Sequence, residues 1–330
     1  TTGLFQAESW DGDSAAAVAH AGKVLFSRGG VVQVALIGGA TGASLSADGP
    51  SDYTGASGDI VLLDLDESSI VLHEGAIEPV VAPGVAAIGA VMVVVGGLRA
   101  DDSGELSASS TISRCDVDGL DYVCTQVGDL ATARTMPAVS CLNESCEQLL
   151  VVGGNSDGPV AEVIDFTASA TAPEQTSMAS PGLPGALHFP VVCSEKLVSG
   201  ADADGEGVLP LTMDVDASVG VLTAEELENL DGLETTVQGA VFGGSDGDCW
   251  IFGGRHVAEG TTSTAVWRVT DNAVVSAGSG VALDSPRYGA AVAAIATGEL
   301  EGSVLIGGGL TLGDGPDDAA LVHGAEIFRP

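Results

Sequence analysis

A short apolar strand that ends in two small residues recurs along the chain, and this repeat limits the fold more than any other feature. The six copies are ALIGG at 35–39, VVVGG at 93–97, LVVGG at 150–154, KLVSG at 196–200, WIFGG at 250–254 and VLIGG at 304–308. Consecutive copies start roughly 50 residues apart, a period that is typical of propeller blades. The repeat therefore predicts a β-propeller with six blades.

Each copy has similar neighbours along the chain. Apolar strands of small residues precede the repeat at 136–141, 188–193, 237–242 and 288–295. Third strands follow a polar loop at 58–65, 110–117, 161–166, 263–269 and 325–330. A more polar fourth strand follows, as in DYVCTQV at 121–127. Four antiparallel strands per repeat make one blade, so we expect an all-β chain. Only AEELENL at 224–230 has the pattern of a helical turn.

The paired glycines are expected where a strand near the central channel leaves its sheet and turns. A positive φ, or close backbone contact with the next blade, excludes a Cβ at such a position. Ser199 takes the first place in the fourth copy, so that position is less strict. The uncharged segment at 79–98 could span a bilayer by length, but prolines and glycines interrupt it. We interpret it as two buried strands and a turn.

The two ends of the chain complement each other. AEIFRP at 325–330 stops after a third strand, and TTGLFQAES at 1–9 has the pattern of the missing fourth strand. Joined tail to head, these segments resemble the passage between the third and fourth strands of bacterial kelch repeats. The chain is thus similar to the kelch-repeat β-propellers, whose members include the galactose-oxidase-type central domain. The resemblance implies one six-bladed domain over 1–330, with residues 3–8 closing the last blade so that no sheet edge is left open.

The first blade leaves two registers open. GKVLFSRGG at 22–30 also resembles the double-glycine strand, and in that register the first blade carries an insertion. The predicted blade count is six in both registers.

Acidic residues dominate the charge of the chain. There are 46 Asp and Glu against 10 Lys and Arg, a formal net charge of -36. Nucleic acid and anionic membranes are disfavoured partners, because both require a cationic patch. Two interpretations remain open. The surface is a solvated acidic coat suited to a salty medium, or it binds cations or a basic partner.

Six cysteines form an even set with suggestive spacing. Cys115 and Cys124 flank a hairpin turn, Cys141 and Cys146 flank a short loop, and Cys193 and Cys249 lie near equivalent turns of neighbouring blades. We expect three disulfides in these pairs, which places the protein outside the cytoplasm: extracellular, periplasmic or on the cell surface. The alternative is six buried free thiols that act as small apolar groups.

The few cations suggest a ligand site. Arg99, Arg255 and His256 follow double glycines, so they should lie on loops that emerge on one face of the ring. Kelch domains that bind acidic peptides use loops on that face, and the resemblance implies a similar use here. Buried arginines could select a carboxylate through paired hydrogen bonds. The alternative is a weak surface ion pair with a neighbouring acid, Asp101, Asp102 or Glu259.

Calcium is the one cofactor that the sequence suggests. Asp202, Asp204 and Glu206 alternate along one loop, and calcium takes six to eight oxygens from flexible acidic loops. No EF-hand pattern is complete, and Asp-Gly pairs are also ordinary turn formers.

No nucleophile elbow, phosphate loop or zinc-binding helix occurs in the sequence. We therefore expect a recognition or scaffold module that binds a protein or glycan through its loops and has no catalysis of its own. Its ends suggest a domain or subunit of a larger assembly. Two alternatives stay open: a carbohydrate-active enzyme of kelch type, and a structural subunit of an extracellular assembly.

Overall fold

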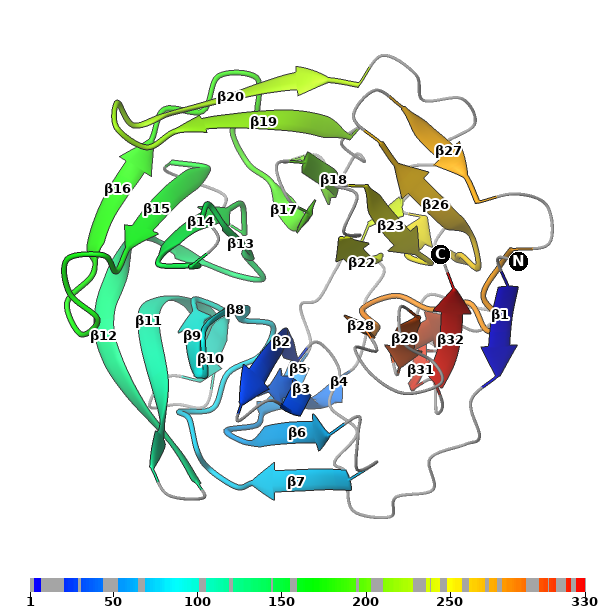
Figure 1. The fold of residues 1–330 in the computed structure, drawn as a ribbon, viewed down its shortest axis with the longest axis horizontal. Coiled ribbons are helices and arrows are strands. Elements are labelled where there is room, and N and C mark those ends of the chain that lie inside the picture. The colour runs from blue at the N-terminus through cyan, green and yellow to red at the C-terminus, as the bar shows by residue number, and fades with distance from the viewer. Residues whose placement is uncertain are drawn as a thin grey trace.

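The protein folds as a ring of antiparallel sheets around a central axis (Figure 1). The computed structural model describes residues 3–6, 21–28, 31–43, 53–64, 69–100, 105–118, 121–143, 145–154, 159–193, 196–202, 210–227, 236–237, 239–243, 248–256, 261–270, 273–277, 281–294, 303–307, 309–312, 319–321 and 325–329. Every regular element in these residues is a strand, and none is a helix. The predicted all-β propeller is confirmed.

Five sheets have the four-stranded form that the repeat predicts. Their strands, in spatial order, are β2 (Gly22–Arg28), β3 (Val31–Ile37), β6 (Ile60–Asp64) and β7 (Ser69–His73); β13 (Ala138–Cys141), β14 (Gln148–Val152), β15 (Ala161–Asp165) and β16 (Glu174–Met178); β17 (His188–Cys193), β18 (Lys196–Ala201), β19 (Leu211–Asp216) and β20 (Val221–Glu226); β22 (Ala240–Gly243), β23 (Cys249–Phe252), β26 (Val266–Val269) and β27 (Val274–Ser276); and β28 (Ala291–Ala294), β29 (Val304–Gly307), β32 (Ala325–Arg329) and β1 (Gly3–Gln6).

One further sheet has five strands, β8 (Gly84–Ile88), β9 (Val91–Val95), β10 (Leu98–Ala100), β11 (Leu106–Asp118) and β12 (Asp121–Arg134). Strand β11 is 13 residues long, so its start pairs with β10 while its middle pairs with β9. The prediction of six four-stranded blades was therefore wrong in its count. Five sheets have that form, because the uninterrupted β11 draws β10 into the remaining one.

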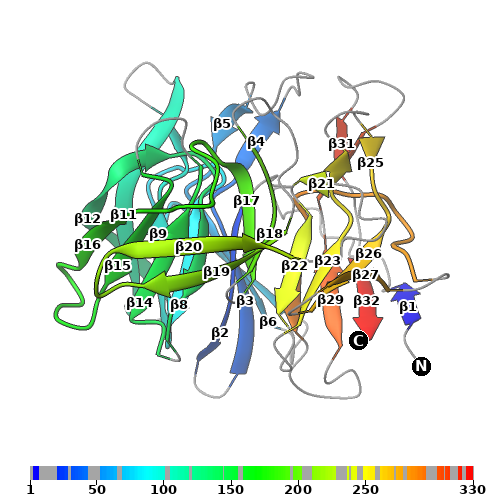
Figure 2. The same cartoon turned by 90° about the horizontal axis from the view of Figure 1, so that it is seen from above.

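Short hairpins occupy the place of β10 elsewhere in the ring. They follow the second strands and form separate small sheets: β4 (Ala40–Ala43) with β5 (Tyr53–Ala56), β24 (Arg255–His256) with β25 (Thr261–Thr262), and β30 (Leu310–Leu312) with β31 (Ala319–Leu321). Strand β21 (Thr236–Val237), which precedes β22, also pairs with β24. Labelled strands of all three small sheets lie on the same side of the ring, at the top of Figure 2. We call this side the hairpin face.

The head of the chain completes the sheet at its tail. Strand β1 pairs antiparallel with β32, from Gly3 opposite Arg329 to Gln6 opposite Glu326. Figure 1 shows the two termini close together beside this sheet. The predicted closing strand is thus confirmed for residues 3–6. Residues 7 and 8 of the predicted segment lie outside the described residues.

The paired glycines lie where one sheet touches the next. The Gly254 amide donates to the Arg287 carbonyl oxygen at 2.8 Å, and the Gly39 amide donates to the Val80 carbonyl oxygen at the same distance. A Cβ on Gly253, whose φ is 65°, would lie 2.3 Å from the Arg287 carbonyl oxygen. Close backbone contact therefore requires glycine, as predicted. With Ser199 in the first place, β18 instead runs on to Ala201.

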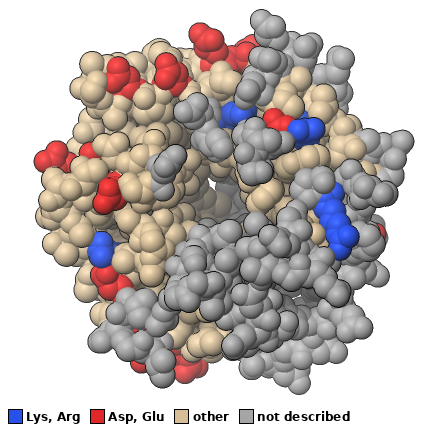
Figure 3. Space-filling model, viewed as in Figure 1, with Lys and Arg blue, Asp and Glu red and all other residues tan. Residues whose placement is uncertain are grey.

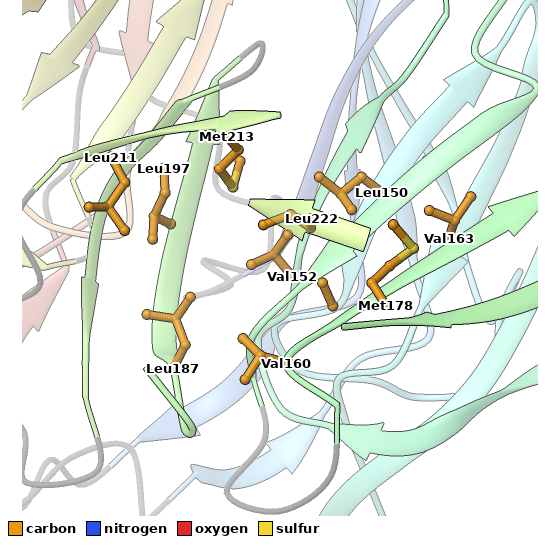
Figure 4. Close-up of a cluster of buried hydrophobic side chains, with 11 residues drawn as sticks. Leu150, Val152, Val160, Val163, Met178, Leu187, Leu197, Leu211, Met213 and Leu222 are labelled. Atoms are coloured by element: carbon orange, nitrogen blue, oxygen red, sulfur yellow. The ribbon is translucent and has the colours of Figure 1, made fainter. Parts of the chain in front are cut away.

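Apolar clusters fill the seams between consecutive sheets. One cluster joins β13–β16 to β17–β20 and includes Leu150, Val152 and Leu197 (Figure 4). Strand β9 shows why such strands are apolar throughout. Met92 and Val94 belong to the seam on one side of their sheet, while Val93 and Val95 belong to the seam on the other side. Both faces are buried, so no position on β9 is left for a polar side chain.

Two local predictions are settled by these strands. Residues 79–98 contain β8, a turn, β9 and the start of β10, which confirms two strands and a turn. No helix among the described residues is long and apolar enough to cross a membrane. The helical turn predicted at 224–230 is wrong for residues 224–226. They belong to β20, because their backbone pairs with β19.

In the sheet made of β2, β3, β6 and β7, residues 22–28 form the first strand, β2. Strand β3, with the double glycine after it, is the second strand. This resolves the open register of that blade.

Three disulfides join the six cysteines in the predicted pairs. Cys115 and Cys124 lie directly opposite each other on β11 and β12. Cys141–Cys146 closes the loop between β13 and β14, and Cys193–Cys249 joins β17 to β23 of the next sheet. The chain has no free cysteine. Three disulfides suggest an oxidising, extracellular environment.

Candidate ligand-binding site on the hairpin face

The predicted cations lie on the short strands that follow double glycines. Arg99 lies on β10, while Arg255 and His256 form β24. Arg99 is two residues after Gly97 and Arg255 directly follows Gly254, and these two glycine amides donate to the Arg134 and Arg287 carbonyl oxygens, just before the first strand of the next sheet. The turns thus fix where both arginine backbones lie.

Arg99 is buried rather than displayed on an open loop. Its residue surface is 7% exposed. Its Nη1 donates to the Glu78 carboxylate at 3.0 Å and to the Glu78 carbonyl oxygen at 3.2 Å. Burial lowers the pKa of the Arg99 guanidinium, and the charge of Glu78 opposes this effect. Glu78 precedes Arg99 by 21 residues, so no local sequence pattern predicts this ion pair.

On the opposite edge of the Arg99 guanidinium, the described residues provide no acceptor. Nε and Nη2 are buried, and neither has a hydrogen-bond partner among the described residues. These two nitrogens form the side edge that presents two parallel N–H groups to a carboxylate. Of the local acids considered as partners, Asp101 and Asp102 lie outside the described residues. Arg99 is therefore a charged group whose hydrogen-bonding capacity is half used.

Arg255 lies near a buried tyrosine, Tyr288. The Arg287 carbonyl oxygen accepts from Gly254, so the residues that follow each of these two, Tyr288 and Arg255, are held close together. Burial raises the pKa of the Tyr288 phenol to about 12, and the positive charge of Arg255 partly opposes this rise. The Nε of Arg255 is also buried with no hydrogen-bond partner among the described residues.

Sequence reasoning missed Tyr288 because it treated YGAAVAAI only as an apolar strand. The signal that could have found it is the Arg-Tyr pair at the start of that segment. His256 is half-buried, and its backbone lies opposite Thr236 and Thr261. Glu259, considered as a partner for this group, lies outside the described residues.

The structure does not gather the predicted cations into one cluster. The sheet that contains β10 and the sheet that contains β23 and β26 lie on opposite sides of the central axis (Figure 1). Figure 3 shows the described basic side chains scattered among acidic and neutral ones around a central opening. We therefore treat Arg99 and Arg255 as two separate candidate positions on the hairpin face.

The calcium prediction falls mostly outside the described residues. Asp202 follows the end of β18 and is half-buried, whereas Asp204 and Glu206 are not described. Where the structure describes the chain, no group of three His, Cys, Asp or Glu side chains could hold a metal ion. Calcium at this loop stays a prediction.

No protein-family model matches this chain, and a search of curated proteins finds no match. The propeller and its site geometry are therefore the basis for a functional proposal.

Proposed function

We propose that this protein is an extracellular recognition module of kelch type, which binds a carboxylate-bearing protein or glycan on its hairpin face. In this proposal the five-stranded sheet of β8–β12 is the sixth blade of a single ring over 1–330. The three disulfides and the compatibility of the propeller fold with binding support the proposal. The partner is neither nucleic acid nor membrane, because a net charge of -36 repels polyanions.

The observation that carries the proposal is the unused edge of Arg99. A buried donor without an acceptor costs about 1–3 kcal/mol, and a charged donor costs more. A carboxylate that accepts from both Nε and Nη2 removes this cost in one interaction. Both nitrogens are buried in the folded chain, so a ligand must displace the groups that cover them. The new hydrogen bonds offset the free energy that this displacement costs.

Glu78 makes the position selective for a bidentate anion. It occupies Nη1 and balances part of the charge, so Arg99 stays ordered before a ligand arrives. Preorganisation of this kind reduces the entropy lost on binding. Arg255 offers a second donor on the same face, and its Nε is likewise buried without a partner among the described residues. A ligand with several carboxylates could use both positions.

The direct test is a binding screen with matched charged and neutral ligands. The probes are oligogalacturonate, an uncharged galactan, a poly-glutamate peptide and a serine-glycine peptide of equal length. We expect the carboxylated members to bind and Arg99→Gln to weaken them by about tenfold or more, since a charged hydrogen bond is worth about 1.5–3 kcal/mol. Binding of the neutral members alone, or of none, would overturn the proposal.

A matched control separates the site from general charge. Arg114 forms a bidentate ion pair with Asp116 on β11, at 2.7–3.0 Å. Arg114→Gln removes the same charge as Arg99→Gln but leaves the hairpin face unchanged. Equal loss of binding in both variants would show that net charge, rather than Arg99, controls the interaction.

A further inference from the structure

The three disulfides differ in how readily a thiol in solution can reach them. Cys115 and Cys249 are fully buried, Cys193 is 6% exposed, and Cys124 is half-buried. Cys141 is exposed, and its partner Cys146 is half-buried. Thiol–disulfide exchange requires direct attack of a thiolate on one sulfur, so access controls which bond reacts. Among the three, only the bond between Cys141 and Cys146 joins an exposed cysteine.

The backbone of Cys146 gives a second reason for reactivity. Its φ is 55°, in the left-handed region that a residue with a Cβ rarely adopts. The Cys146 amide donates to the Asn143 carbonyl oxygen at 3.0 Å, which closes a tight turn inside the disulfide loop. Opening the disulfide frees Cys146 to leave this unfavourable conformation. The conformation of Cys146 therefore destabilises the closed disulfide loop, and reduction relieves this backbone strain.

The hairpin that carries this bond does not need the bond to hold together. Strands β13 and β14 pair over four residues, from Ala138 opposite Val152 to Cys141 opposite Leu149. Beyond them the Leu142 amide donates to the Gln148 carbonyl oxygen at 2.9 Å. After reduction this ladder keeps the two thiols near each other, and a loop this short closes again at little entropic cost. The pair is thus suited to repeated opening and closing.

We propose that Cys141–Cys146 is a reversible thiol-exchange site that reacts with low-molecular-weight thiols, while the other two disulfides are structural. A thiolate attacks the Sγ of Cys141 and forms a mixed disulfide. The bond between Cys141 and Cys146 breaks, and the Cys146 thiolate leaves and takes a proton from water. A second thiolate attacks the mixed disulfide and releases Cys141 as a thiol. Two thiols are oxidised to one disulfide, and the protein disulfide is reduced to two thiols.

The test uses the folded protein, dithiothreitol as the thiol, and rapid alkylation followed by peptide mass mapping. We expect Cys141 and Cys146 to be alkylated at least about tenfold faster than the other four cysteines, because none of those four is exposed and each is bonded to a buried partner or is itself buried. Circular dichroism recorded in parallel should show an intact fold at the stage when only this pair is labelled. Removing the reductant and adding oxidised glutathione should restore the bond.

Two outcomes would overturn the proposal. The first is simultaneous labelling of all six cysteines together with loss of the fold. The second is a pair at Cys141–Cys146 that resists reduction longer than Cys193–Cys249. The variant Cys141→Ser with Cys146→Ser is the matched control, and it should show no fast labelling phase at the same reductant concentration. Should that variant fail to fold, the labelling order of the unaltered protein decides the question alone.

Discussion

Arg134 and Glu162 form an ion pair in which both side chains are completely buried, with Nη2 2.7 Å from Oε1. Arg287 and Glu326 repeat this pair in the sheet that closes the ring. The Arg134 and Arg287 carbonyl oxygens both accept a hydrogen bond from the double glycine of the preceding sheet. The two pairs are thus the same feature of the repeat, because each arginine lies four residues before the first strand of a sheet and each glutamate lies on the third strand of that sheet.

Arg134 also donates to the Gly153, Pro159 and Val160 carbonyl oxygens, and Glu162 accepts from the Ala131 amide. Burial lowers the pKa of Arg134, while Glu162 opposes this effect. Arg134 is thus paired with Glu162 and three backbone carbonyl oxygens, and Glu162 is paired with Arg134 and one backbone amide. The pair therefore neutralises its own charges and also holds the backbone in place where the chain passes from one sheet to the next.

The first prediction concerns this pair. Arg134→Met should lower the free energy of unfolding by about 3–5 kcal/mol, because it leaves the Glu162 carboxylate buried without its counter-charge. Adding Glu162→Leu should cost less than the two single changes together, by about 1–3 kcal/mol. Urea unfolding measures both. Arg114→Met, which breaks a partly exposed pair with Asp116, should cost about 1 kcal/mol or less; an equal cost for both arginines would contradict the prediction.

The second prediction concerns the disulfide between sheets. Cys193 and Cys249 are 56 residues apart, whereas Cys141 and Cys146 are 5 apart. Loop entropy predicts that replacing Cys193 and Cys249 with alanine costs about 4 kcal/mol, against about 2 kcal/mol for the shorter loop. Chemical unfolding of the two double variants compares them. The prediction fails if the loss of the short-loop bond is the more damaging of the two.

The third prediction concerns the closing strand. Removal of residues 1–6 takes away the pairing of β1 with β32 and exposes the edge of β32. We expect a lower melting temperature and faster cleavage by protease near residues 325–329, because an unpaired edge opens more readily. Addition of the peptide TTGLFQAES in excess should recover part of the melting temperature. A shortened chain as stable as the full one would show that β1 is not needed for closure.

The fourth prediction concerns salt. A net charge of -36 opposes the compact state by self-repulsion, so the melting temperature should rise as sodium chloride increases. The effect should level off near 1 M, where the Debye length is about 3 Å. Choline chloride should act like sodium chloride if screening is the cause. Specific cation binding at that loop would give a different result. Calcium would then raise the melting temperature at much lower ionic strength, and the double variant Asp202→Asn with Asp204→Asn would abolish that rise.

The fifth prediction concerns Tyr288, whose pKa burial raises to about 12. The unfolded chain releases this proton near pH 10, so stability from Tyr288 is fully present below pH 10 and is lost as pH rises toward 12. Absorbance at 295 nm should show a tyrosine step near pH 12 that Tyr288→Phe removes. A variant that keeps this step would show that another tyrosine produces it.

Much of the ring could be predicted because the features of the repeat depend on residues that are close together in the sequence. The double glycines, the apolar second strands and the fourth strand at the head of the chain each follow from a local physical requirement. Gly253 shows the reason, since a Cβ there would collide with the Arg287 carbonyl oxygen. The three cysteine pairs could also be predicted, because their positions relative to the strands were already clear.

The sequence by itself therefore determined the propeller, its closing strand and its disulfides. Only the tertiary structure decided that β11 runs unbroken into a five-stranded sheet, that Arg99 pairs with Glu78, and that Tyr288 lies beside Arg255. These outcomes depend on contacts between residues far apart in the chain. Strand patterns and glycine spacing depend only on residues that are close together in the chain. They do not indicate which distant side chain a buried charge will contact.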